Sequence, residues 1–401
     1  MVTRGEQMLA LRKRRMSETH PFLRGGFRPF FLGAALWGLI AITMWLAALA
    51  GTLVLPTALE PIAWHRHEML FGFVGAAVAG FLLTAIPNWT GRLPIAGKPL
   101  LSLFSLWALA RLAVLFSAVI GFWAIAILDV GVFVSLALLA AREVIASKNR
   151  NAPIVGVVLL FGLADAADYL GAAGIISGDL GWRGAIGLVI IMISMIGGRI
   201  IPSFTRNWMV KQGVTDALPT QPENLDRLII ASTAVALISW IAFPDHRLTG
   251  LVLILAAAAQ ALRLGRWGGI RTTSDPLVLV LHLGYLWVPI GLLLLGLSTA
   301  GLGIPRSAGV HALTAGAMTT MILAVMTRAS LGHTARELRA SPLTVVAYLS
   351  VTVGAVLRVA ASFGIGAYSL MLDAAGGFWA AALLLFLIVY LPVLWRPRLG
   401  D

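Results

Sequence analysis

The chain alternates between long apolar runs and short polar segments, and this alternation predicts its secondary structure. A helix that crosses the hydrocarbon core of a bilayer needs about 20 mostly apolar residues, each adding about 1.5 Å. Twelve runs of the sequence meet this requirement. They lie at residues 29–50, 63–86, 99–120, 122–142, 153–175, 183–203, 225–243, 248–265, 276–298, 307–328, 342–363 and 374–395. The pattern therefore predicts an all-α fold, a polytopic membrane bundle of twelve transmembrane helices.

Composition narrows the class of protein further. Hydrophobic residues make up 59% of the 401-residue chain and charged residues only 12%, against about 25% charged residues in an ordinary soluble protein. These values exclude a water-soluble enzyme, a disordered tail and a secreted disulfide scaffold. The chain has no cysteine, which removes iron–sulfur clusters, covalent c-type haem, blue copper and cysteine zinc sites. Any metal here depends on histidine, with carboxylate or methionine in support.

The distribution of positive charge predicts the orientation. With the N-terminus inside, the inner segments hold 24 Lys and Arg residues and the outer loops hold four. Cytoplasmic loops carry such an excess, so we expect both termini in the cytoplasm. The first 28 residues lack the apolar region of a signal peptide, which indicates an uncleaved anchor. The predicted organisation is a basic cytoplasmic segment at 1–28, a single transmembrane domain at 29–395 and a cytoplasmic tail at 396–401. Because the basic residues are dispersed, we expect no nucleic-acid partner.

The second, sixth and tenth predicted helices can be aligned with one another by offsets of 115 and 129 residues. Gly72, Gly187 and Gly316 then coincide, and His67 and His311 fall at equivalent positions. Four helices separate successive copies, which favours three four-helix units. Twelve helices arranged in this way would resemble the catalytic subunit of haem–copper oxidases. Apolar sequences also align by chance, so the alignment leaves a non-repetitive bundle open.

Six of the seven histidines are candidate metal ligands. A histidine at the membrane interface often lies among lipid headgroups without binding a metal. We interpret His246, in an outer loop, in this way. Polar groups inside apolar helices are costly and usually mark a functional site. By depth the remaining six form an outer and an inner set: His65, His67 and His311 lie toward the outer side, and His20, His282 and His333 toward the inner side.

The spacing of the outer histidines limits how they bind a metal. His65 and His67 are two residues apart, or about 200° around a helix. They should point to opposite flanks, which favours two centres, or one centre and one structural histidine, over joint chelation; a non-helical start of this segment would reverse the inference. Neutral imidazole is a good ligand for haem iron and for copper. Two imidazoles on opposite faces of a macrocycle make a b-type haem, and we expect His311 to pair with either His65 or His67.

Charged residues near the predicted helix ends and interiors allow two interpretations. Haem propionates need cationic partners, although the positive-inside rule explains most of these arginines equally well. The candidates are Arg66 on the outer side and Arg24, Arg28, Arg199, Arg206 and Arg328 on the inner side.

The acidic residues inside the predicted helices also allow two interpretations. Asp129, Asp165 and Asp168 either form structural ion pairs with Arg111 and Arg358, or belong to a proton path from the outer face. In the second reading Glu68 lies at the mouth of the path, with Asp165 and Asp168 inside it. Tyr285 lies three residues after His282, on the same helix face, and could hydrogen-bond an inner ligand.

Several motifs together resemble the NnrS family of bacterial membrane proteins. They are His20–Phe31, the run WHRHEMLFGFVGAAVAGFLLTAIPNWTGR at 64–92, Gly198–Asn207, His282–Tyr285 and His311–His333. The resemblance implies a twelve-helix protein of the bacterial inner membrane that carries haem b and copper. It further implies an association with denitrification and with resistance to nitric oxide, that is, to nitrosative stress. The histidines of the family's motifs fall on His20, His65, His67, His282, His311 and His333.

Three functions remain as hypotheses at this point. The first is a membrane oxidoreductase that binds and reduces nitric oxide, with a donor such as quinol supplying electrons and the gas arriving through membrane lipid. The second is a protective protein that binds nitric oxide or nitrosylated metal without turnover. The third is an ion-coupled transporter, which inverted repeats would favour; the repeat proposed here keeps its orientation. The sequence fixes neither the oligomeric state nor the division of histidines between haem and copper.

Overall fold

The computed structural model describes residue 10 and residues 18–147, 153–220 and 222–400. Most of the predicted basic segment 1–28, and the last residue of the predicted tail, lie outside these ranges. Within them twelve helices are long and apolar enough to cross a membrane, and no strand occurs. The predicted all-α fold with twelve spans is therefore confirmed for the described residues.

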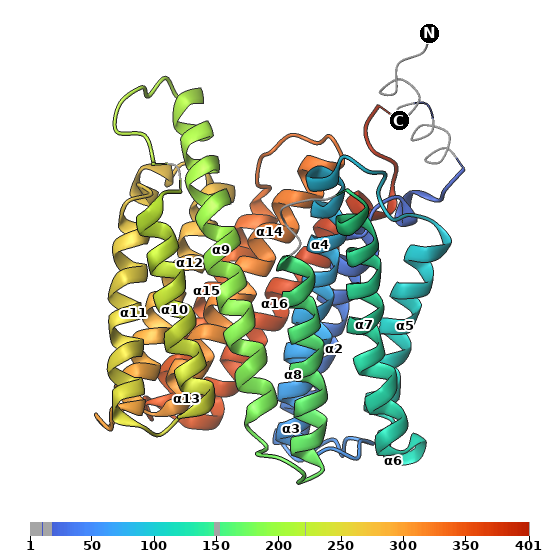
Figure 1. Ribbon diagram of the computed structural model, residues 1–401, viewed down its shortest axis with the longest axis vertical. Helices are drawn as coiled ribbons and strands as arrows, with labels where there is room; N and C mark the ends of the chain where they lie inside the picture. Colours follow the sequence, from blue (N-terminus) through green and yellow to red (C-terminus); the bar gives the residue numbers. More distant parts are fainter. Residues whose placement is uncertain (1–9, 11–17, 148–152, 221, 401) are drawn as a thin grey trace. The chain divides into compact units, whose positions relative to one another are not determined.

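The spanning helices follow the chain in simple order (Figure 1). They are α2 (Phe27–Leu49), α3–η2–α4 (Pro61–His67, Glu68–Val74 and Gly75–Thr90), α5 (Lys98–Leu115), α7 (Phe122–Ala146), α8 (Pro153–Ala172), α9 (Leu180–Lys211), α10 (Asn224–Ala242), α11 (Arg247–Gly265), α12 (Pro276–Thr299), α13–η4–α14 (Arg306–His311, Ala312–Met318 and Thr319–His333), α15 (Pro342–Ser362) and α16 (Tyr368–Trp395). Three short helices complete the list: η1 (Pro21–Leu23), α6 (Ser117–Ile120) and η3 (Gly269–Thr272).

Most helix ends lie close to the ends of the predicted apolar runs, and the differences have local causes. Helix α9 continues to Lys211, beyond the predicted end at 203, because a helix does not have to stop where its side chains turn polar. The predicted span 99–120 is interrupted after α5, and a single turn, α6, precedes α7. Gly121 joins α6 to α7 with φ at 102°, a left-handed conformation that glycine adopts without steric cost.

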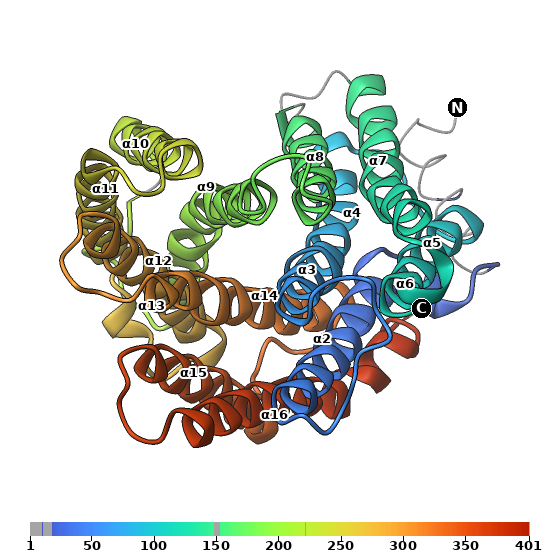
Figure 2. The ribbon, with the colours of Figure 1, turned by 90° about the horizontal axis from the view of Figure 1, so that it is seen from below.

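The described chain separates into two compact units. The first comprises the described residues of the ranges 1–182, 329–337 and 387–401, and the second those of the ranges 183–328 and 338–386. In the first unit α4 packs against α2 and α7, and α7 also packs against α5 and α8 (Figure 2). In the second unit α10, α11 and α12 are neighbours in sequence and in space, and η4 packs against α12 and α15. The single transmembrane domain and the three four-helix units both stay predictions.

Two spans contain seven-residue π-helical segments, and both segments begin directly after a candidate histidine. Segment η2 follows His67 and segment η4 follows His311. A shift of 244 residues, the sum of the two alignment offsets, places one on the other residue for residue. The π-helix is rare and is frequent at functional sites. This agreement supports the predicted correspondence of the second and tenth spans.

Close packing of α11 on α12 depends on a glycine and gives a stability test. A Cβ added at Gly250 would lie 2.5 Å from the backbone nitrogen of Ala300. Gly250→Ala should therefore force the helices apart and lower the free energy of unfolding by about 1–3 kcal/mol. The measurement is thermal unfolding of the detergent-purified protein. Gly265→Ala on the same helix, where a Cβ meets nothing within 4 Å, is the matched control and should not destabilise.

Candidate functional site

The second span presents its two histidines on different sides. The ring of His65 stacks on Trp45 of α2, with ring centroids 4.5 Å apart. His67 is 1% exposed and points toward α7 and α8, where its ring nitrogens meet acidic side chains. The rings diverge as their two-residue spacing predicts, because α3 is helical across both positions.

His67 lies between carboxylates from two helices. Its Nε2 is 2.8 Å from Oδ2 of Asp129 in α7, and its Nδ1 is 3.2 Å from Oδ2 of Asp168 in α8. The hydroxyl of Tyr169 donates to the same oxygen of Asp129 at 3.0 Å. Asp165, one helical turn before Asp168, has Oδ1 3.8 Å from Nδ1 of His67. The spacing of Asp165, Asp168 and Tyr169 places all three on one face of α8.

Arg111 of α5 supplies the buried positive charge of this cluster. Its guanidinium forms an ion pair with Asp129 and donates to Oε2 of Glu68 at 2.9 Å. All three side chains are at most 1% exposed. Burying an ion is costly unless a partner of opposite charge compensates, so Arg111 makes the burial of both carboxylates tolerable.

Gly72 in segment η2 leaves room for the side chain of Glu68 to reach Trp37 of α2. The indole nitrogen of Trp37 donates to Oε2 of Glu68 at 2.5 Å. A Cβ at Gly72 would lie 2.5 Å from that oxygen and 2.8 Å from the indole nitrogen. The carbonyl of Gly72 accepts a hydrogen bond from Trp107 of α5 at 3.2 Å. Gly72 thus leaves the space in which Trp37 meets Glu68.

The remaining members of the cluster are Arg66 and Asp165. Arg66 donates to Oδ1 of Asp168 at 3.2 Å, and its side chain is 27% exposed, so this pair marks the accessible edge. Asp165 is fully buried, and neither of its oxygens has a hydrogen-bond partner among the described residues. Within those residues one group of histidine and acidic side chains has the spacing for a metal ion, namely His67, Asp129 and Asp165, with ligand atoms within 4.8 Å of one another.

A second buried polar network lies in the second unit. Arg263 of α11 donates to Asp226 at 2.7 Å, to the carbonyl of Ser194 at 2.7 Å and to the hydroxyl of Tyr285 at 3.0 Å. That hydroxyl donates in turn to Oε1 of Gln260 at 2.5 Å. Tyr285 therefore hydrogen-bonds this network, and a hydrogen bond from it to an inner metal ligand stays a prediction. The sequence interpretation missed Arg263 and Asp226, since Arg263 was one of the 24 Lys and Arg residues counted for the inner segments; Gln260 inside an apolar run was the available signal.

The candidate histidines of the second unit have different environments. His311 in α13 is half-buried, and its Nδ1 donates to the carbonyl of Ser307 at 2.7 Å. That bond leaves Nε2 with its lone pair. His282 of α12 is 5% exposed, and its Nε2 lies 2.8 Å from the hydroxyl of Thr205. Its Nδ1 has no hydrogen-bond partner in the described part of the chain.

The other candidate histidines lie at one end of the first unit. His20 caps η1, accepting from the backbone of Phe22, and packs its edge against Trp395. His333, at the end of α14, lies with its ring centroid 5.5 Å from that of Phe27. Both histidines are exposed.

Most arginines predicted as propionate partners have protein contacts of their own. Arg28 donates to the carbonyls of Leu394 and Arg396 at the end of α16, and Arg24 donates to the carbonyl of Thr19. Arg328 lies over the ring of Phe204 at 4.0 Å. Arg199 and Arg206 are exposed. A contact with a propionate stays a prediction for all of them, Arg66 included.

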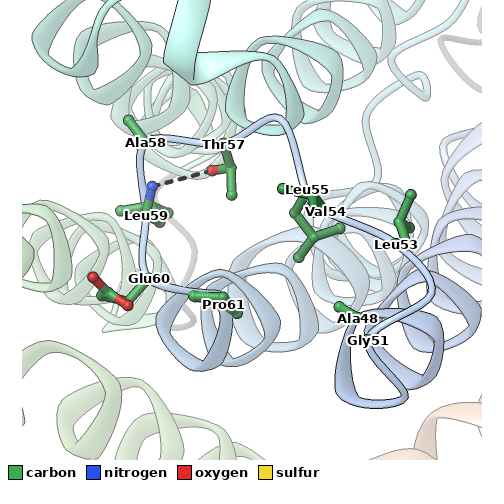
Figure 3. A pocket seen from close by; sticks show the side chains of 10 residues that line it. All are labelled: Ala48, Gly51, Leu53, Val54, Leu55, Thr57, Ala58, Leu59, Glu60 and Pro61. Atoms are coloured by element: carbon green, nitrogen blue, oxygen red, sulfur yellow. Dashed lines mark hydrogen bonds between the residues drawn. The ribbon is translucent and has the colours of Figure 1, made fainter.

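A pocket of about 390 Å³ lies in the loop between α2 and α3 (Figure 3). Its lining is mainly apolar, with Thr57 and Glu60 as its polar side chains. Thr57 accepts a hydrogen bond from the backbone of Leu59, which fixes the loop. None of the candidate ligands lines this pocket.

The fold and the site define a polytopic α-helical membrane protein with ionisable groups buried inside its spans. The chain belongs to the NnrS family: the family described as NnrS protein matches residues 21–398, nearly the whole chain. No curated protein matches it significantly. Family membership makes this a membrane protein related to nitric oxide and supports metal or haem binding, in keeping with the His67–Asp129–Asp165 group.

The ion pairs of Arg111 give a direct test of the cluster's structural role. Arg111→Met leaves Asp129 and Glu68 buried without their cation, and we expect a loss of about 3–5 kcal/mol in the free energy of unfolding. Thermal or denaturant unfolding in detergent measures it. Arg358→Met is the control, because the half-buried Arg358 of α15 donates to the uncharged Ser362. Equal losses in the two variants would contradict this role.

Proposed function

We propose that this protein binds nitric oxide and reduces it in the bacterial cytoplasmic membrane, using haem b and copper and electrons from a donor such as quinol. The observation that carries the proposal is the NnrS match across residues 21–398. Nitric oxide is small and uncharged, so it can reach a site between helices through the lipid. When bound, haem and copper supply metal coordination positions for the gas and accept electrons for its reduction.

Among the histidines, His311 fits the requirements of a haem ligand best. A metal-bound histidine usually donates its second ring nitrogen to a carbonyl or carboxylate, which fixes the tautomer and aims the lone pair. The Nδ1 of His311 makes such a bond to the carbonyl of Ser307. His67 fits less well, because carboxylates contact both its ring nitrogens. The pairing of His311 with His65 or His67, and metal binding by the other candidate histidines, stay predictions.

Reduction of nitric oxide to nitrous oxide consumes protons. Two molecules of the gas, two electrons and two protons give one nitrous oxide and one water. The first unit holds acidic side chains suited to donating protons at the two ends of a hydrogen-bonded chain. The chain begins at Asp168 beside Arg66, continues with His67, Asp129 and Arg111, and ends at Glu68. Because the guanidinium of Arg111 does not give up its proton, Asp168 and Glu68 act as separate proton donors.

The geometry modifies two details of the predicted proton path. Glu68 is fully buried, so the accessible end of the chain is Asp168 beside the part-exposed Arg66 and not Glu68. Asp165 makes no hydrogen bond to the described residues, so it does not continue the chain. The proposal therefore assigns proton transfer to Asp168 and Glu68.

Purified protein tests the haem and nitric oxide proposals together. We expect a Soret band that shifts with nitric oxide, and consumption of the gas with formation of nitrous oxide when quinol is added. His311→Ala should lower the haem content at least tenfold, because the iron loses a ligand. His246→Ala, in an outer loop, should keep it. Stoichiometric binding without nitrous oxide would overturn the reductase in favour of a protective binding protein, and full haem content in His311→Ala would overturn the assigned ligand.

Reporter fusions test the orientation. Green fluorescent protein fluoresces when it folds in the cytoplasm, and alkaline phosphatase is active only when exported. A fluorescent protein fused after residue 401 should be bright. A phosphatase fused after Asp245, in the loop between α10 and α11, should be active. The reverse pattern would show that the termini lie outside.

A further inference from the structure

Asp165 is the one carboxylate of the cluster in the first unit that makes no hydrogen bond within the described residues. It is 0% exposed, and both of its oxygens lack a partner. Its Oδ1 is directed at His67, 3.8 Å from Nδ1. Leaving a buried carboxylate uncompensated is expensive. Asp165 is therefore either protonated or placed beside a positively charged species in the working protein, and the surrounding ligand atoms favour the second.

The ligand atoms around Asp165 have the spacing that a metal ion requires. One atom each from His67, Asp129 and Asp165 lie within 4.8 Å of one another. Bonds of about 2.0–2.2 Å from nitrogen or oxygen to a cation place ligands up to about 4.4 Å apart, so a small inward movement of the side chains completes the site. The three residues come from α3, α7 and α8, which pack in one unit.

Neighbouring groups are placed to orient these ligands. Oδ2 of Asp168 lies 3.2 Å from Nδ1 of His67 and can accept its proton, which leaves the Nε2 lone pair directed at Asp129. Carboxylate–histidine–metal arrangements use this contact to fix the tautomer. Tyr169 and Arg111 both donate to Asp129 and hold its carboxylate. The network around Arg263 in the second unit contains no comparable unpartnered carboxylate, because Asp226 and the other side chains of that network hydrogen-bond one another.

The charge balance of the cluster accommodates one divalent ion. The cluster contains four carboxylates, on Glu68, Asp129, Asp165 and Asp168, against the two guanidinium groups of Arg66 and Arg111. With His67 neutral, as a metal ligand must be, one divalent cation brings the net charge to zero. Protons on both His67 and Asp165 would give the same balance without an ion, and the infrared band of a protonated Asp165 distinguishes that state.

The donor atoms select the class of metal. Carboxylate oxygens suit hard cations and imidazole suits borderline ones, whereas soft Cu(I) prefers thiolate or thioether sulfur. We propose that His67, Asp129 and Asp165 bind one hard or borderline divalent transition-metal cation, namely zinc, ferrous iron or manganese, separate from haem and copper. The proposal is independent of nitric oxide reduction, since it rests on charge and geometry within the first unit.

Metal analysis of the purified full-length protein tests this assignment. The protein is stripped with chelator, dialysed against Zn²⁺ or Mn²⁺ and analysed for zinc, manganese, iron and copper, with haem iron measured separately by its pyridine spectrum. We expect about one non-haem divalent ion per chain. Asp165→Asn should weaken binding at least tenfold, and it breaks no hydrogen bond to a described residue, so the fold is spared. Glu143→Gln on α7 is the control: this buried carboxylate pairs with Arg92 and Arg142 and should not affect metal content.

A stability measurement provides the second readout. Chelator should lower the melting temperature of the wild type and of Glu143→Gln, and should leave that of Asp165→Asn unchanged. Four results would overturn the proposal: no bound ion in the wild type, equal metal in Asp165→Asn, copper as the ion lost, or an infrared band of protonated Asp165 in metal-treated protein. Protein that binds the divalent ion but neither haem nor nitric oxide would overturn the proposed function and leave this site intact.

Discussion

Compensation of buried charge is the constraint that organises the first unit. A charged side chain at the centre of a bilayer costs at least about 2.5–3.5 kcal/mol, and this unit buries Glu68, Arg111, Asp129 and Asp165 almost completely. Arg111 can serve Glu68 and Asp129 only when α5 lies beside both η2 and α7. The ion pairs therefore require this packing of the helices. A side chain at position 72 would collide with Glu68 and Trp37 and push them apart.

The two buried networks differ in completeness, and that difference separates structure from chemistry. Around Arg263 the side chains of Asp226, Ser194, Gln260 and Tyr285 satisfy one another, which is what a network that only holds helices together requires. Around Arg111 the satisfied pairs surround a carboxylate, Asp165, that nothing among the described residues satisfies. A buried polar network alone therefore indicates no function, whereas a buried carboxylate without a hydrogen-bond partner among the described residues does.

The sequence predicted the number of spans well, because length and apolarity are properties of each segment by itself. It also singled out Glu68, Asp129, Asp165 and Asp168 as costly. Their partners depend on which helices are neighbours, and this a single sequence does not encode locally. Arg111 and Arg358 were equal candidates for pairing with aspartate, yet Arg111 meets Asp129 while Arg358 donates to Ser362.

The π-helical segments could not be predicted from the sequence either. A switch from α-helical to π-helical hydrogen bonding changes which backbone groups pair but leaves the apolar composition of the segment the same. They are evident only in the structure, where η2 and η4 begin at the residues after His67 and His311. The positive-inside rule also misled the interpretation of one residue. Arg263 was counted with the inner segments, whereas its side chain is only 1% exposed and lies inside a polar network.

The order in which the cluster's members are synthesised bears on how the protein enters the membrane. Glu68 leaves the ribosome before Arg111, and Asp129 and Asp165 follow in later spans. The second span therefore meets lipid while its carboxylate still lacks a counter-charge, and only its apolar remainder favours insertion. Release of each helix into the bilayer on its own would expose these groups in turn. The second to fifth spans are better suited to leave the insertion machinery as an associated group.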